Sequence, residues 1–437
     1  MWPKRLFLFF SVILLSLLPA ILFHRSEIPL FWKWSANYAL FAILYLGLCV
    51  LSVVFYLKID KIGLTFCVYL LFIYGFSFLL IDFVIGSVSY YSQVDMRSHP
   101  VYHHFPHPGK HRLIVRNNFF SNQRFNMSIN SAGLRSDKEI PISKPENCFR
   151  ILALGDSFLQ GYGVNDHETC CYLLEKYLND SENDTVRYEV LNAGVNSFAP
   201  IIEYIYLKTD GVRFNPDLVI LLLDMSDLWQ TQEYLKRAIK DQNGTIVAIR
   251  PPAVTLWGRV NRFILNRFYY TSWLIMYIER TFFKEEYDKT QTAIRRRDIE
   301  DIRFTLSADQ KPWAEEWQSV YADIDLINGF CKERNIGFAV VVYPWGHQVN
   351  GFEWAEGRKW WNIPDNYTAP PDVSYMLEEE FRKRGIPVLN LFPTFRDYKG
   401  SELLYYVIDL HWTKEGNKLA AQCLYDFVKD KFLRKNR

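Results

Sequence analysis

The chain has 437 residues, enough for a membrane region and one large soluble domain at roughly 100 to 200 residues per domain. Its 50 Lys and Arg residues balance 48 Asp and Glu residues, so the chain has no field of one sign that would gather nucleic acid, and we expect no nucleic-acid partner. The seven cysteines show no zinc-type spacing and do not decide the compartment.

Three apolar segments occupy the start of the chain, at residues 6–23, 38–57 and 62–81. Each is free of charge and about as long as a helix must be to cross roughly 30 Å of hydrocarbon. A signal peptide at residues 6–23 is the weaker interpretation, because no small-residue cleavage site follows. The sequence therefore predicts a membrane anchor over residues 1–90 with three transmembrane helices in the lipid bilayer.

The flanking charges predict the orientation of this anchor. Basic residues are more frequent on the predicted side of the N-terminus (Lys4, Arg5, Lys58, Lys61) than on the opposite side (Arg25, Lys33). Because the richer side faces the cytoplasm, everything after about residue 90 is expected to be exported. Asp82, at the outer end of the third segment, is expected to reach interfacial water.

Residues 91–148 form an extracytoplasmic lead-in that is rich in His, Pro, Asn and Ser and lacks a sustained period. We expect an irregular segment packed on the domain surface. Its histidines could suggest a metal site, but no Cys or carboxylate lies among them in a ligand pattern, so a solvated loop is expected (His99, His103, His104, His107, His111).

Residues 149–437 alternate between short apolar runs and helix-like stretches. Runs that are apolar on both faces are typical of parallel strands covered by helices. They predict an α/β fold, a three-layer α/β/α sandwich with a parallel sheet, whose strands lie at residues 150–154, 188–192, 218–223, 337–343 and 387–391. The last helix is expected at residues 414–432, with Thr413 as its N-cap.

More than 100 residues separate the third and fourth predicted strands, far more than a crossover needs. This predicts a long insertion at about residues 228–318. Within it, residues 254–283 mix aromatic side chains with arginines, a pattern that suits either a helix on the bilayer surface or a helical lid on the domain.

Polar residues follow the predicted strands where a parallel sheet binds its ligands. Gly155, Asp156 and Ser157 follow the first strand, and they predict a tight turn with Asp156 as its structural acceptor and Ser157 presented at a helix N-terminus. Gly194 follows the second strand and offers a backbone N–H group to an oxyanion. Asp224 begins a polar stretch after the third strand.

A second pair of polar residues lies just before the last predicted helix. Asp409 and His411 are two residues apart, so the carboxylate can hold one imidazole nitrogen while the other faces a hydroxyl. A serine hydroxyl needs such a base to become a nucleophile. Ser157, His411 and Asp409 are therefore the candidate catalytic residues.

In this order, these blocks resemble the SGNH (GDSL) hydrolase superfamily from about Asn130 to the C-terminus. The resemblance implies that Ser157 attacks an ester, that His411 acts as base and then acid, and that Asp409 orients His411. It also implies an oxyanion hole formed by the N–H groups of Ser157 and Gly194, without a cofactor or metal. The family's third-block Asn is missing here, and Ser226 is the candidate that replaces it.

The lead-in motif at residues 129–135 and the short Asp-x-His spacing are similar to those of membrane-anchored bacterial members such as the periplasmic alginate O-acetyltransferases. This resemblance implies a multi-pass protein of the bacterial inner membrane with a periplasmic esterase or O-acyltransferase domain. The expected substrate is an acylated envelope glycan or another ester, and a membrane acyl-donor protein is a candidate partner.

Two alternatives stay open, and two further residues are candidates for substrate contact. The aromatic insertion would also suit a lipid or lysophospholipid esterase, whereas the altered third block would suit a catalytically silent, glycan-binding or scaffold subunit. Asp224 and His347 lie after predicted strands and could contact substrate, although His347 could equally be a surface-loop histidine.

Overall fold

The computed structural model describes residues 36–58, 74–83, 96–109, 113–116, 124–181, 186–253, 303–361 and 372–433, with isolated positions in 8–18, 256–271 and 363–370. Most of the first predicted apolar segment, residues 62–73 of the third, His111 and most of residues 254–283 lie outside the described residues. The chain divides into two compact units, Met1–Ser92 with Val254–Lys284, and Gln93–Ala253 with Glu285–Arg437.

The first unit contains helix α2 (Ala36–Lys58) and a helical stretch at residues 74–83. Asp82 is buried in this stretch, where it accepts hydrogen bonds from the backbone N–H (2.9 Å) and the hydroxyl (2.6 Å) of Thr271. This differs from the expectation that Asp82 reaches interfacial water, because its carboxylate is paired within the protein. Over the residues that are described, no helix combines the length and the apolarity of a membrane span.

The lead-in of the second unit is more regular than its sequence predicts. It forms two antiparallel pairs, β1 (Met96–His99) with β2 (His103–Pro106), and β3 (Leu113–Arg116) with β4 (Arg124–Met127). Tyr102, in the first hairpin turn, also bridges to Ile249 and is buried. The expectation of an irregular segment is therefore wrong for these four strands, where the backbone finds hydrogen-bond partners within the lead-in itself, whereas residues 128–147 form turns and isolated bridges.

A five-stranded parallel sheet forms the centre of the second unit, in the order β11-β10-β7-β5-β6. Its strands lie where the apolar runs predict them, and every residue of the third is buried. The predicted α/β fold with a parallel sheet is thus confirmed, and its strands are β5 (Cys148–Leu154), β6 (Arg187–Asn192), β7 (Leu218–Leu223), β10 (Gly337–Val342) and β11 (Val388–Asn390).

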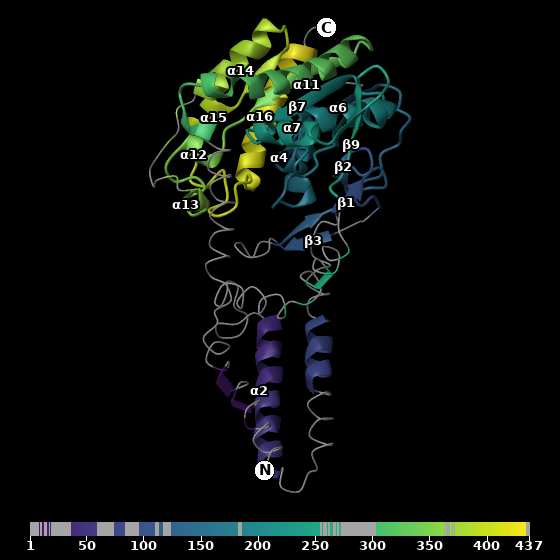
Figure 1. The fold of residues 1–437 in the computed structure, drawn as a ribbon. Helices are drawn as coiled ribbons and strands as arrows, with labels where there is room; N and C mark the ends of the chain where they lie inside the picture. The colour runs from purple at the N-terminus through teal and green to yellow at the C-terminus, as the bar shows by residue number, and fades with distance from the viewer. Residues whose placement is uncertain are drawn as a thin grey trace. The chain divides into compact units, whose positions relative to one another are not determined.

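Helices cover both faces of this sheet (Figure 1). The chain moves in one direction from β5 to β6 and in the other from β6 through β7 and β10 to β11, so right-handed crossovers place their helices on opposite faces. One face carries α5 (Cys170–Ser181) packed on α16 (Lys414–Val428), and the other carries α6 (Pro200–Thr209), α11 (Ala314–Lys332) and α14 (Asp372–Lys383).

Shorter elements complete the described part of this unit. Helix α16 begins as predicted, because the Thr413 hydroxyl caps the N–H groups of Glu415 and Gly416, and it continues into a π-helical turn at Lys429–Leu433. The other short elements are α4 (Ser157–Gln160), α7 (Asp227–Leu235), β8 (Ala238–Lys240), β9 (Ile246–Ile249), α12 (Gly346–Val349), α13 (Gly357–Trp360), α15 (Phe392–Arg396) and the 3₁₀ turns Asp166–Glu168, Gly211–Phe214, Arg303–Leu306 and Lys311–Trp313.

The strand order fixes where a ligand can bind. Strands β5 and β7 lie side by side, but the connections that leave them run to opposite sides of the sheet. Such a switch point opens a crevice beyond the carboxyl ends of the strands. The residues that follow β5, β7 and β10 therefore meet at one edge of the sheet.

Candidate active site

Ser157 is the first residue of helix α4, directly after the turn that follows β5. Asp156 caps this helix, since its Oδ1 accepts a hydrogen bond from the Phe158 N–H (2.9 Å), as expected for a structural acceptor. Gly155 is required by packing, because a Cβ atom there would lie 2.9 Å from the Leu159 Cβ. Helix α4 has only four residues, so the predicted help from a helix dipole at Ser157 is small.

The structure brings Ser157, His411 and Asp409 together in one row. The Ser157 hydroxyl lies 2.7 Å from the His411 Nε2. On the other side of the ring, Nδ1 is hydrogen-bonded to the Asp409 carboxylate, which also accepts the His411 backbone N–H (3.0 Å). With Nδ1 protonated toward Asp409, Nε2 is the nitrogen that accepts the serine proton.

A closed loop presents Asp409 and His411 to the serine. Tyr405 and Trp412 form an antiparallel bridge at its base, and the Tyr406 N–H donates to the His411 carbonyl (3.1 Å). The imidazole packs against the rings of Phe158 and Tyr162, each with its centroid 5.0 Å away. Sequence analysis did not single out these two rings, although both follow Ser157 closely in the chain.

The surroundings of His411 make it a competent base. Burial lowers the pKa of the imidazole, but the charge and the hydrogen bond of Asp409 act against burial, and the pKa lies above its usual value. A raised pKa stabilises the imidazolium ion that forms when a serine proton is taken up.

Asp156 lies on the other side of Ser157 with its Oδ2 3.5 Å from the hydroxyl. Burial, followed by the nearby charge of Asp224, raises the pKa of Asp156 to about 8. Asp156 is therefore protonated at neutral pH and places no full charge beside the nucleophile.

Asp224 and Ser226 are engaged with each other and with the strand β10 region. The Asp224 carboxylate accepts hydrogen bonds from the Tyr343 hydroxyl (3.0 Å), the Trp345 indole N–H (2.8 Å), and both the N–H (2.8 Å) and the hydroxyl of Ser226. Asp224 is buried, so no oxygen of its carboxylate is open to a substrate, contrary to the expectation. The Ser226 hydroxyl proton is already donated to the Asp224 carboxylate.

Close packing requires a glycine at position 194, and the sequence alone did not show this. A Cβ atom there would lie 2.4 Å from the Gln160 backbone nitrogen, so only glycine allows the loop after β6 to approach helix α4. Its N–H donates to the Asn192 Oδ1 (2.9 Å) and is not free for the oxyanion role expected of it. Within the described part of the chain, the Ser157 N–H has no acceptor and remains the available backbone donor.

His347 does not lie where the sequence predicted it, at a substrate site or in a surface loop. Its side chain is fully buried, and its Nε2 lies 2.9 Å from the Thr305 hydroxyl. Burial, and then the charge of Arg358, lowers the pKa of this imidazole to about 3, so it is neutral. A buried, neutral ring packed among tryptophans is neither a substrate contact nor a surface-loop histidine.

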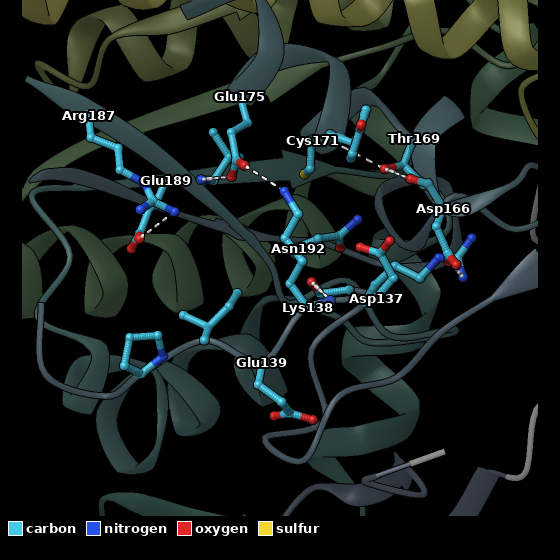
Figure 2. Close-up of a pocket in the computed structure, with 16 residues that line it drawn as sticks. Asp137, Lys138, Glu139, Asp166, Thr169, Cys171, Glu175, Arg187, Glu189 and Asn192 are labelled. Carbon is cyan, nitrogen blue, oxygen red and sulfur yellow. Dashed lines mark hydrogen bonds and ion pairs between the residues drawn. The ribbon is translucent and has the colours of Figure 1, made fainter. Parts of the chain in front are cut away.

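The last residue of the lead-in motif, Arg135, holds the end of helix α4 and the turn that follows it. Arg135 is buried and donates from Nε to the Gln160 carbonyl (3.1 Å) and from Nη2 to the Val164 carbonyl (2.9 Å), and it forms an ion pair with Asp166 (2.5 Å). Figure 2 shows the small polar pocket beside it, about 90 Å³ in volume, with Asp166 and Asn192 in its lining. Ser157, His411 and Asp409 are not among the residues that line this pocket.

No metal centre is assembled by the described residues, among which no group of three His, Cys, Asp or Glu side chains is arranged to hold an ion. His103 and His104 instead contact each other through their Nδ1 atoms (2.8 Å), and the His104 Nε2 lies 2.6 Å from the Asn196 carbonyl oxygen. His104 thus ties the first hairpin to the loop after β6.

Comparisons with family models and with curated proteins gave no match. Among solved structures, the chain is similar to a putative lipolytic protein of the G-D-S-L family from Desulfitobacterium hafniense DCB-2, at 12% identity and a TM-score of 0.31, covering 64% of this chain and 98% of that one. It is also similar to an acetyl xylan esterase, AlAXEase (13% identity, TM-score 0.32, 64% and 100% covered).

A third similar structure is a two-domain esterase active on acetylated mannans, at 12% identity and a TM-score of 0.33, where 65% of this chain matches 49% of that one.

Proposed function

We propose that the chain is an SGNH-type serine esterase or O-acyltransferase. The observation that carries this proposal is the row in which the Ser157 hydroxyl, the His411 imidazole and the Asp409 carboxylate are hydrogen-bonded in sequence at the switch point of the sheet. The blocks around Ser157, Gly194 and Asp409–His411 occur in the family's order along the chain, which supports the assignment to that superfamily.

The arrangement suits acyl transfer in two steps. Ser157 attacks the ester carbonyl while His411 takes the hydroxyl proton and Asp409 stabilises the resulting imidazolium ion. As the tetrahedral intermediate collapses, the ester C–O bond breaks and His411 returns the proton to the departing alcohol. Water, or the hydroxyl of a second sugar, then attacks the acyl-serine with His411 again as base, which gives hydrolysis or transfer.

The oxyanion hole of this enzyme would be sparse. We assign one donor to it, the free Ser157 N–H, since the Gly194 N–H and the Ser226 hydroxyl are engaged elsewhere. Loss of one such donor typically costs about 10²- to 10³-fold in rate. We therefore expect a slow enzyme, and the same observation favours a catalytically silent, glycan-binding scaffold as the second candidate function.

We propose an O-acetylated cell-envelope glycan as the substrate and a bacterial inner-membrane location, with the domain on the periplasmic side. The support is the three uncharged apolar segments near the N-terminus and their flanking basic residues. Anchoring the site beside the bilayer would raise its effective concentration near envelope substrates and near a membrane acyl-donor protein. Membrane fractionation with an alkaline wash tests the anchor.

Fluorophosphonate labelling of the full-length chain tests the chemistry. We expect labelling that disappears in Ser157→Ala and falls sharply in His411→Ala. Ser319→Ala on helix α11 is the matched control and should label like the wild type. If the folded wild-type chain is neither labelled nor able to hydrolyse an ester, the proposed enzyme function is wrong and the scaffold function takes its place.

The acyl group is tested separately. Release of acetate from an acetylated polysaccharide, without release of fatty acid from a lysophospholipid, is the expected result. The reverse preference would move the assignment to a lipid esterase, with Ser157 in the same role.

A further inference from the structure

A short segment after helix α12 holds the loop that carries Asp409 and His411, here called the catalytic loop (residues 404–413). The Glu353 carboxylate is buried and accepts hydrogen bonds from two consecutive N–H groups of this loop, those of Leu404 (3.1 Å) and Tyr405 (2.9 Å). A carboxylate that accepts two backbone N–H groups fixes the position of a loop strongly.

Trp354 makes the contact that lies nearest to the catalytic pair. Its indole N–H donates to the carbonyl of Ile408 (2.8 Å), the residue directly before Asp409. The tryptophan is buried and has a φ of 55°, a left-handed conformation that is rare for a bulky side chain. Backbone strain of this kind persists where the surroundings hold it, and it gathers at functional sites.

Glycine at position 357 is needed for this contact. A Cβ atom at Gly357 would lie 1.8 Å from the Trp354 Nε1 and 2.2 Å from the Ile408 carbonyl oxygen, directly in their hydrogen bond. The Gly357 N–H (3.0 Å) and the Glu356 N–H (2.8 Å) also donate to the Val407 carbonyl. The segment therefore holds the catalytic loop at four of the five residues from 404 to 408.

We propose that Trp354 is a positioning residue that, with Glu353, sets the distance between His411 and Ser157 by holding the catalytic loop. This inference rests on the proposed function. The indole does not touch the reacting atoms, so it acts through the backbone of Ile408 on the direction of the Asp409 carboxylate. A displacement of about 1 Å at a catalytic group can cost about 10²-fold in rate.

Trp354→Phe in the full-length chain tests this proposal, because it keeps an aromatic ring and removes the N–H donor. Trp361→Phe is the matched control, since Trp361 packs near Trp354 (ring centroids 6.3 Å apart) and makes no hydrogen bond to the catalytic loop. Hydrolysis of 4-nitrophenyl acetate gives kcat and KM, and hydrogen–deuterium exchange reports the protection of residues 404–411.

We expect kcat to fall about 10- to 100-fold in Trp354→Phe with KM nearly unchanged. The acid limb of the kcat/KM profile should move to lower pH, because a loosened Asp409 raises the pKa of His411 less, while Asp156 and Asp224 still face the ring. Exchange should quicken in residues 404–411, and Trp361→Phe should match the wild type in all three readouts.

An unchanged kcat and unchanged exchange in a folded Trp354→Phe would overturn the proposal. If that variant does not fold, Glu353→Gln decides in its place, because it removes one acceptor from the same loop and should lower kcat and loop protection together. If the wild type itself shows no turnover, the proposed function fails, whereas the exchange data still show whether Trp354 holds the loop.

Discussion

The buried carboxyl of Asp156 should make the stability of the protein depend on pH. The pKa of this carboxyl rises from an ordinary 3.8 to about 8 because it is buried beside Asp224. Between these two pH values the folded chain binds more protons than the unfolded chain, so this group makes the protein less stable as the pH rises, and its effect is constant above about pH 8. At about 1.4 kcal/mol for each pKa unit, the upper limit is about 6 kcal/mol.

Asp156→Asn removes this pH dependence and keeps the cap. The amide oxygen can accept the Phe158 N–H as the carboxyl does. The free energy of unfolding of wild type and variant, measured in urea at several pH values, should therefore converge near pH 4 and diverge by several kcal/mol in favour of the variant near about pH 8.

The same variant has an expected effect on activity. Above about pH 8 the wild-type carboxyl ionises at 3.5 Å from the Ser157 hydroxyl, where a negative charge opposes the developing oxyanion. Activity of the wild type should fall there, and Asp156→Asn should keep its plateau to higher pH. A difference in stability that does not change with pH, together with identical alkaline limbs, would refute a protonated Asp156.

Further predictions concern the other contacts of the site. Asp409→Asn should lower kcat about 10³- to 10⁴-fold and move the acid limb of kcat/KM to lower pH, since the charge that raises the pKa of His411 is lost. Gly194→Ala should destabilise the chain by about 1 to 3 kcal/mol in urea unfolding, because its methyl group meets the backbone of helix α4. Tyr343→Phe should lower the free energy of unfolding in urea by about 1 to 3 kcal/mol, since the buried Asp224 carboxylate loses a hydrogen-bond donor.

Matched variants make these outcomes decisive. An activity of Asp409→Asn close to that of the wild type would show that the carboxylate does not orient the base. Gly329→Ala on helix α11 is the control for the glycine change, because an added Cβ meets no atom within 4 Å there. Tyr375→Phe, at an exposed position of helix α14, is the control for the tyrosine change.

The sequence by itself was sufficient to predict the parallel sheet of the second unit and to propose a set of candidate catalytic residues. Short apolar runs mark all five strands, since a parallel strand buried on both faces must be apolar on both. Ser157 is singled out because residues that follow parallel strands meet at one edge of the sheet. Asp409 and His411 are singled out by their spacing just before the last helix, which suits a carboxylate that orients an imidazole. Local signals also place Thr413 as the cap of the last helix.

Only the tertiary structure decided which polar groups are free to act. A sequence shows that Gly194, Ser226, Asp224 and His347 follow strands, but it does not show which partner takes the proton or the lone pairs of each. Gly194 and Ser226 bond to side chains only two residues away, and the fold sets the orientation of those side chains. Asp224 and His347 bond to residues far away in the sequence, which no local pattern records. The hold of Trp354 on the catalytic loop, 54 positions away, depends on the fold for the same reason.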